Sequence, residues 1–385
     1  MTFPRPGGGA GNGAAARAFP GRTTERGTMP DQAERRPRPA FPTHGAPSLP
    51  WGVTVDAYNA EIREGGGFLG DQANNRAFKA ILAWWRGKVR EVGEDDPLGD
   101  TPTEAISRRQ LDKLLTEGDP EAAGLVHGVV EEFAQSLADV AGRLLREDAW
   151  RGVQRIVVGG GMRGSRVGEL SMGRASVLLK ADGRDVDLVP IRHDPDGAGL
   201  IGGLHLAPLD ALSGHDGVLA VDIGGSNIRA GVVRPGFKEA PDLSAASVWD
   251  SKKWGHAEEE PGRDEAIERL VAMLRELAEE AEGRDFRLAP FIGVGCPGRI
   301  GDDGSIESGG QNLPGHWEDE GFDLPGRIRG GLPRIGGADT AVVVHNDAVV
   351  QGLSQAPWMG DVRRWAVLTI GTGLGNACFT NRGDG

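Results

Sequence analysis

The spacing of apolar side chains along the chain predicts several helices. One covers residues 120–145, where apolar side chains recur every three or four positions: Leu125, Val129, Phe133, Leu137, Val140 and Leu144. It is preceded by Asp119, a typical N-cap residue, and begins with Pro120, which suits the first helical position. Further helical structure is predicted over residues 264–282, over 198–204 and, more loosely, over 51–117.

Shorter apolar runs predict buried strands, and most of them end in glycine or polar residues. Three of these strands cover residues 155–158, 218–222 and 228–233. Three more are predicted to end within residues 293–298, 342–347 and 367–373. Residues 176–191 are typical of a hairpin, with Asp182 and Gly183 in its turn. Strands that alternate with helices predict an α/β fold with layered sheets, and open sheets of this kind bind ligands where their strands end.

The first 50 residues follow neither pattern. They are rich in glycine, proline, alanine and arginine, and they hold too little apolar surface to offset the entropy of ordering. We therefore expect a disordered tail, within which Met29 is an alternative start of translation. The rest of the chain is long enough for two lobes of about 150 residues each.

Charge and cysteine content narrow the class of protein. The chain has 43 Lys and Arg residues against 56 Asp and Glu residues, a net charge of -13, which is unsuited to sequence-independent binding of nucleic acids. Its two cysteines, Cys296 and Cys378, lie in apolar runs, which argues against a disulfide framework or a cysteine zinc site. Since the sequence has neither a membrane-length apolar run nor the core of a signal peptide, we expect a soluble, cytoplasmic protein.

The first candidate site follows the predicted strand 218–222. An acid, two glycines, a hydroxyl and an amide come together there: Asp222, Gly224, Gly225, Ser226 and Asn227. Glycines with positive φ and no Cβ would let backbone N–H groups approach a phosphate. Asp222 would face a metal ion instead, because carboxylate and phosphate repel each other. An ordinary glycine hairpin between two strands is the alternative interpretation.

A second glycine turn follows the strand that ends at residue 370. It contains Gly371, Thr372 and Gly373 and would hold phosphates from the opposite side. A dinucleotide-binding turn is less well supported, because it needs a following helix and an acidic residue about 20 positions on. A plain turn is the other alternative.

The third candidate is the pair Asn346 and Asp347, at the end of an apolar strand. An amide beside a carboxylate suits an acceptor hydroxyl, which the amide orients and the carboxylate deprotonates. The alternative is that Asn346 serves as the N-cap of a following helix.

In order and spacing these motifs resemble the N-terminal half of the ROK family of sugar kinases, part of the actin-like superfamily of sugar kinases and ATPases. The resemblance covers residues 218–380 and includes 295–298 (GCPG) and 311–315 (QNLPG) between the motifs. In the family the first loop reads DIGGT, the catalytic pair NDA and the second loop GTGxG. Here Ser226 replaces the threonine and keeps its hydroxyl.

The C-terminal half of the family is similar to sequence that lies upstream in this chain. After a long helix, residues 156–161 (IVVGGG) and 198–203 (AGLIGG) resemble its closing IVIGGG and AGLIGAA segments. The resemblance implies a circular permutation, which exposed loops and neighbouring termini make physically reasonable. The expected domains are a tail over 1–50, the C-terminal, adenosine-side half over 51–210 and the N-terminal half over 211–385. A truncated tandem or fusion protein is the alternative.

The resemblance also implies a fold and an activity. The fold would be two RNase H-like α/β lobes of the actin and hexokinase type around a cleft that binds ATP and Mg²⁺. A hydroxyl of a small carbohydrate would be phosphorylated, with Asp347 as general base and Asn346 and Asn312 as substrate ligands. The phosphates would be held by Gly224, Gly225, Ser226, Asn227, Gly371, Thr372 and Gly373, the adenosine by Gly159, Gly160 and Gly161, and Mg²⁺ by Asp222 through water. A homodimer is implied as well.

The sequence departs from the family where the sugar is recognised. Neither the family's E-x-G-H segment nor its cysteine-rich zinc motif is found in it. Three histidines that follow a glycine (His215, His256 and His316) lack the context of that segment, and we expect them to be solvated. The identity of the sugar stays open. A sugar or nucleotide sensor without catalysis and an ATPase that acts on a protein partner are the alternative functions.

Overall fold

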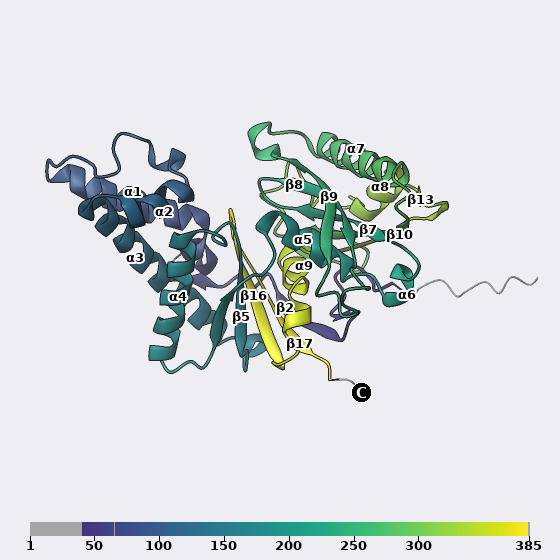
Figure 1. The fold of residues 1–385 in the computed structure, drawn as a ribbon, viewed down its shortest axis with the longest axis horizontal. Helices are drawn as coiled ribbons and strands as arrows, with labels where there is room; N and C mark the ends of the chain where they lie inside the picture. Colours follow the sequence, from purple (N-terminus) through teal and green to yellow (C-terminus); the bar gives the residue numbers. More distant parts are fainter. Residues whose placement is uncertain (1–40, 65, 384–385) are drawn as a thin grey trace, which may run out of the picture. The chain divides into compact units, whose positions relative to one another are not determined.

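The computed structural model describes residues 41–64 and 66–383, which form a mixed α/β fold with two main sheets (Figure 1). Residues 1–40, most of the predicted tail, lie outside the described residues. Across the six-stranded sheet the order is β1 (Ser48–Leu49), β2 (Val53–Tyr58), β17 (Leu374–Asn381), β16 (Arg364–Ile370), β5 (Arg155–Gly160) and β6 (Asp187–Pro190). Across the five-stranded sheet it is β15 (Ala341–Asn346), β10 (Leu288–Cys296), β7 (Gly217–Ile223), β8 (Ile228–Arg234) and β9 (Ser247–Trp254).

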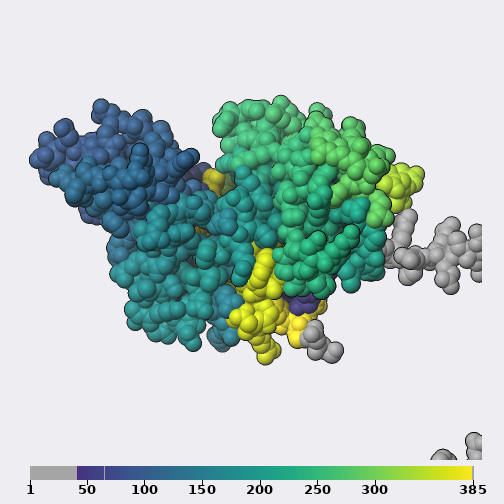
Figure 2. Space-filling view, viewed as in Figure 1, coloured from purple at the N-terminus to yellow at the C-terminus, as the bar shows by residue number. Residues whose placement is uncertain are grey.

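Apart from β1, the two sheets have the same topology. In the five-stranded sheet β7, β8 and β9 form an antiparallel series, and β10 and β15 run parallel to β7 on its other side. In the six-stranded sheet β16, β17 and β2 form the antiparallel series, and β5 and β6 run parallel to β16. The six-stranded sheet therefore combines β16 and β17, the last strands that the structure describes, with strands from the first half of the chain. In Figure 2 the yellow C-terminal segment lies among teal and purple ones.

Helices cover both sheets. On one face of the six-stranded sheet α3 (Pro120–Leu144) and α4 (Arg166–Ala181) share a core with Ile156, Val158 and Leu368, and α1 (Asn75–Glu91) and α2 (Arg108–Glu117) pack on α3. The five-stranded sheet packs in the same way against α7 (Arg263–Glu282) and α8 (Leu324–Gly331). Burial of these apolar faces supplies the main driving force for the fold.

Two helices, α5 (Pro195–Leu204) and α9 (Asp347–Leu353), lie between the sheets and pack against each other (Figure 1). Helix α5 contacts β7, β8 and β10, whereas α9 contacts β16 and β17 as well as β10. Their close approach depends on Gly202, where a Cβ would lie 1.7 Å from the Val350 carbonyl oxygen. Elements from either side of residue 210 are thus interleaved, and the equivalence of 51–210 and 211–385 with the two family halves stays a prediction.

The remaining elements are short and connect these layers. They are β3 (Arg63–Glu64), β4 (Gly67–Phe68), η1 (Leu69–Ala73), η2 (Thr103–Ala105), η3 (Asp148–Trp150), α6 (Leu209–Leu212), η4 (His256–Glu258), β11 (Arg299–Ile300), β12 (Ile306–Ser308), β13 (Arg334–Ile335), β14 (Ala338–Asp339) and η5 (Ala356–Trp358).

The predicted helices over 120–145, 198–204 and 264–282 are confirmed as α3, α5 and α7, and the predicted strands as β5, β7, β8, β10, β15 and β16. Asp119 is the N-cap of α3, since its carboxylate accepts hydrogen bonds from the N–H groups of Glu121 and Ala122. None of the described helices has the length and apolar character that a membrane span requires.

Three local expectations are wrong. Residues 176–181 belong to α4 and not to a hairpin, because Gly183 has a φ of 74° and closes the end of the helix. Residues 53–58 form β2 rather than a helix, since pairing with β17 outweighs local propensity. Residues 41–50, expected in the disordered tail, are packed: Phe41 stacks on Phe291 and Leu49 is buried.

Candidate active site

A cavity of about 620 Å³ contains most of the residues singled out from the sequence. Those that line it are Asp222, Gly224, Gly225, Ser226, Asn227, Asn312, Asp347, Gly371, Thr372, Gly373, Gly160 and Gly161. Gly159 and Asn346 do not line it. The strands that carry these residues end at the cavity, as expected for ligand sites in α/β sheets.

The first glycine loop joins β7 to β8 and faces the second glycine loop. The Gly224 N–H donates to the Asn227 carbonyl at 2.9 Å, and the hydroxyls of Ser226 and Thr372 lie 2.9 Å apart. Neither Gly224 nor Gly225 has positive φ, so the conformational reason expected for these glycines is wrong. Space is the better reason at Gly225, where a Cβ would lie 3.0 Å from the Cβ of Asn312.

The second glycine loop is tied to the adjacent strand and helix. The Ile370 carbonyl accepts from the Gly161 N–H, and the Gly371 carbonyl accepts from the Asn75 N–H at the start of α1, both at 3.0 Å. Gly160 has a φ of 83°, and a Cβ there would lie 2.2 Å from the Ile370 oxygen. Only glycine fits at residue 160, where the end of β5 passes close to the end of β16 and the start of the second loop.

Asp347 is the first residue of α9 and directly follows β15. Burial raises the pKa of its carboxyl from the usual 3.8 to about 7, and repulsion by Asp222 adds to the rise. The Ala348 N–H donates to Asp347 Oδ1 at 2.9 Å and opposes the shift. A carboxyl that titrates near neutral pH inside a polar cavity is suited to accept a proton.

Asp222 and Asp347 meet because β7 and β15 flank β10 and end at the same edge of the sheet. Gly295 on β10 pairs with Asp222 on one side and with His345 on the other. Burial raises the pKa of Asp222 as well, but the nearby Arg229 opposes that rise. Arg229 Nη1 lies 3.2 Å from Asp222 Oδ2, a contact set by the direct pairing of the two residues across the β7–β8 hairpin.

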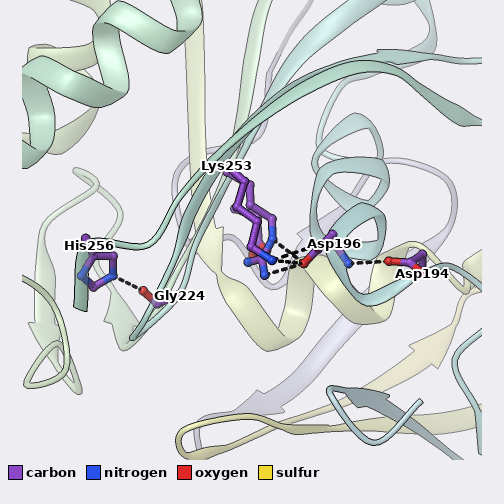
Figure 3. Close-up of polar contacts among 7 residues, drawn as sticks. Asp194, Asp196, Gly224, Lys253 and His256 are labelled. Carbon is purple, nitrogen blue, oxygen red and sulfur yellow. Dashed lines mark hydrogen bonds and ion pairs between the residues drawn. The ribbon is translucent and has the colours of Figure 1, made fainter. Parts of the chain in front are cut away.

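Arg229 belongs to a small network of charges at the cavity. Its Nη2 lies 2.6 Å from Asp196 Oδ1, and Lys253 Nζ lies 2.9 Å from Asp196 Oδ2. Figure 3 shows Lys253 on the strand and Asp196 at the start of α5 pointing toward each other. Asp196 thereby holds the two cations in place beside the first glycine loop.

The Asp222 carboxylate fits a magnesium ion of the kind that is shared with phosphate groups. It offers oxygen ligands, and Mg²⁺ commonly binds one or two carboxylates and completes its shell with water and substrate phosphates. Residues 41–64 and 66–383 contain no group of three or more His, Cys, Asp or Glu side chains arranged to hold a metal ion on their own. The described side chains alone would therefore not complete the coordination shell of the metal ion.

The Asn346 side chain is hydrogen-bonded within the protein and does not face the cavity. Its side-chain oxygen accepts from the N–H groups of Ala348 and Val349, and its Nδ2 donates to the Gly298 carbonyl at 2.9 Å. The side chain is 2% exposed, and these contacts occupy its oxygen and one of its two N–H groups. Asn346 is thus the N-cap of the helix that carries Asp347, and its role as a substrate ligand stays a prediction.

Several cavity residues were not found from the sequence. They are the segments 59–62, 68–71 and 75–76, together with Gln351 and Asn376. They carry no motif, because strand pairing and helix packing bring them to the cavity from distant parts of the chain. Motif spacing contains no signal for such residues.

His256 is the other residue that sequence reasoning misjudged. The expectation of a solvated histidine is wrong, because the side chain is 3% exposed and its Nε2 lies 2.8 Å from the Gly224 carbonyl oxygen (Figure 3). The neighbouring Ala257 N–H donates to the Ser226 carbonyl at 3.3 Å. The turn after β9 thus supports the first glycine loop from behind.

No protein-family model and no curated protein matches the chain. Among solved structures it is similar to a ROK hexokinase from Thermus thermophilus, at 22% identity over 34% of this chain and 35% of the other, with a TM-score of 0.25. A ROK family glucokinase from Streptomyces griseus, solved with glucose and AMPPNP, gives 21% identity over 43% and 45%, with a TM-score of 0.32. An exopolyphosphatase-like protein gives 14% identity over 66% and 87%, with a TM-score of 0.27. The chain spans less than half the length of the two kinases, and the likeness is a partial one of fold.

Proposed function

We propose that the chain is an ATP-dependent kinase that phosphorylates a hydroxyl group of a small carbohydrate, with Asp347 as general base. One observation carries the proposal: the half-buried Asp347 carboxyl, whose pKa is about 7, shares a cavity with two glycine loops that meet at Ser226 and Thr372. The Asp347 carboxyl would accept the proton of the hydroxyl group. The loops account for the binding of phosphates by backbone N–H groups.

In the proposed reaction Asp347 takes the proton of the acceptor hydroxyl. The acceptor oxygen attacks the γ-phosphorus of ATP in line, the new O–P bond forms, and the bond to the β-phosphate oxygen breaks to release ADP. The N–H groups of the two glycine loops hold the phosphates in position, and Arg229, 3.2 Å from Asp222, favours the ionised form of that carboxyl. Bound Mg²⁺ would supply neutralisation of the phosphate charge.

We further propose that the fold consists of two RNase H-like lobes in circularly permuted order. The identical strand order of the two sheets supports this proposal, as does the formation of one sheet from both ends of the chain. In a truncated tandem or fusion protein the partners of β16 and β17 would come from another molecule. Here β5 and β2 of the same chain pair with them. A homodimer and a cytoplasmic location stay predictions.

The first test is an ADP-release assay with Mg-ATP and a panel of hexoses and amino sugars. We expect turnover that depends on one sugar and that falls about 10²–10⁴-fold in Asp347→Asn, because the proton acceptor is lost. Asp302→Asn is the matched control, since Asp302 is exposed and does not line the cavity. Wild-type turnover by Asp347→Asn would contradict the role of that residue, and ATP binding without any sugar-dependent turnover would favour a non-catalytic sensor.

A further inference from the structure

The segment that links β2 to β3 forms one wall of the cavity. Asn59, Ala60, Glu61 and Ile62 all line it. Asn59 has a φ of 51°, in the left-handed region that few residues other than glycine adopt. A backbone in such a conformation persists only where its surroundings hold it, and these positions cluster at functional sites.

Asn376 on β17 holds this wall to the strand that follows the second glycine loop. Its backbone carbonyl accepts from the Asn59 N–H at 2.9 Å. Its side-chain oxygen accepts from the Ala60 N–H at 2.9 Å, and its Nδ2 donates to the Ala60 carbonyl at 3.2 Å. Since Asn376 is 5% exposed, these three hydrogen bonds are shielded from water and fix the wall firmly.

Tyr58 holds the same wall to the strand end that carries Asp347. Its hydroxyl donates to the Ile300 carbonyl and accepts from the Ile300 N–H, each at 3.3 Å. Its ring meets His345 edge-on, with the centroids 5.2 Å apart, and His345 lies two residues before Asp347. The wall is therefore anchored on both sides, and Asn59 lies between the two anchors.

Two polar side chains of this wall have no partner in the part of the chain that the structure describes. Within the described residues neither the Asn59 amide nor the Glu61 carboxylate makes a hydrogen bond or an ion pair. The Asn59 Nδ2 lies 3.0 Å from the point where a Cβ on Gly309 would stand, so the amide faces the loop that leads to Asn312. Unpaired polar groups on a rigid wall are what a ligand rich in hydroxyls requires.

We propose that Asn59 and Glu61 recognise hydroxyl groups of the acceptor and so turn the reacting hydroxyl toward Asp347. This inference rests on the kinase activity proposed above. An amide and a carboxylate can bind neighbouring hydroxyls of one ring, because the carboxylate accepts and the amide both donates and accepts. Glu61 carries a negative charge, so a carboxylate or phosphate of the acceptor placed against it would be repelled. The acceptor class is thus a neutral polyhydroxylated ring.

The experiment compares Glu61→Gln and Asn59→Gly with the wild-type chain. Gln keeps the size of the side chain and removes its charge, and Gly accepts the left-handed backbone while removing the amide. Glu64→Gln is the matched control, because Glu64 contacts Arg143 outside the cavity. ADP release is measured with glucose, N-acetylglucosamine and gluconate, and binding of the same three compounds is measured by calorimetry.

We expect the KM and the Kd of the neutral sugar to rise at least about tenfold in both variants, with the KM of ATP changed less than about twofold. Gluconate should neither bind nor react. If the wild type phosphorylates a sugar and both variants keep its KM, the inference is wrong while the kinase proposal stands. If the wild type binds a sugar without turnover and the variants lose that binding, the inference stands and the kinase proposal is wrong. Binding of none of the three compounds would overturn both.

Discussion

Asp222 and Asp347 lie at the ends of strands on either side of β10, yet their surroundings suit them to different tasks. Asp222 is buried and Asp347 is half-buried, and the loss of solvation raises both pKa values. Asp222 has the Arg229 guanidinium at 3.2 Å, which favours its ionised form. Asp347 has no cation beside it in the described chain, and the charge of Asp222 raises its pKa further. Arg229 therefore distinguishes the two acids, because it opposes the rise in the pKa of Asp222, whereas no cation among the described residues opposes the rise in the pKa of Asp347.

The largest test of this contrast is the stability of Asp347→Asn as a function of pH. Because the pKa of Asp347 rises from 3.8 in the unfolded chain to about 7 in the folded one, folding takes up a proton between these values. The free energy of unfolding of the wild type should consequently fall as the pH rises from about 4 to about 7. Asparagine does not titrate, so Asp347→Asn should be the more stable chain at pH 8, by about 2–4 kcal/mol.

Urea unfolding at pH 8 and pH 4 measures this difference, which should shrink toward zero at the lower pH. Asp302→Asn is again the control, and it should follow the wild type at both pH values. Equal stability of Asp347→Asn and wild type at pH 8 would mean that the Asp347 carboxyl ionises freely in the folded chain. If the inactive variant is the more stable one, the Asp347 carboxylate destabilises the folded chain at that pH, as expected for a residue that serves activity at the expense of stability.

Removing the cation should make Asp222 resemble Asp347. In Arg229→Met the Asp222 carboxyl loses its ion pair and is left buried, which favours its protonated form. We expect kcat/KM to fall about 10- to 100-fold and the Mg²⁺ concentration needed for half-maximal rate to rise, as for other groups that orient a metal-binding carboxylate. Arg174→Met is the control, since Arg174 pairs with Glu131 on α3. An unchanged Mg²⁺ dependence of the rate would mean that Asp222 does not take part in binding the metal ion.

The same contrast shows what the sequence could and could not reveal. Six strands (β5, β7, β8, β10, β15 and β16), the helices α3, α5 and α7 and both glycine loops follow from local patterns, because apolar spacing and glycine are local signals. The pairing of Asp222 with Arg229 depends on the register of the β7–β8 hairpin. The position of Asn59 depends on pairing between β2 and β17, where the hydrogen-bonded residues Ala60 and Asn376 are 316 positions apart in the sequence. Contacts of this kind leave no mark in a single sequence.

Asn346 and His256 show the same limit at single residues. The sequence allowed Asn346 either to bind a substrate or to cap a helix, and only the three-dimensional contacts of its amide show that it caps α9. His256 lies in a polar stretch that looks exposed, whereas the turn after β9 folds it under the first glycine loop. Local composition describes the average surroundings of a residue type, and these two residues differ from that average.

The smallest effect is expected where the first glycine loop is supported from behind. His256→Phe removes the contact to the Gly224 carbonyl but keeps a ring of similar shape, and the Ala257–Ser226 hydrogen bond remains as a second support. Loss of one such bond should raise the KM of ATP about threefold to tenfold and leave the KM of the sugar unchanged. His256→Gln, which can still donate to the carbonyl, should recover part of the loss, and His316→Gln should have no effect. If the sugar KM rose as much as the ATP KM, the turn after β9 would support the whole cavity rather than the loop, and Asp222 and Asp347 would share one scaffold despite their different charges.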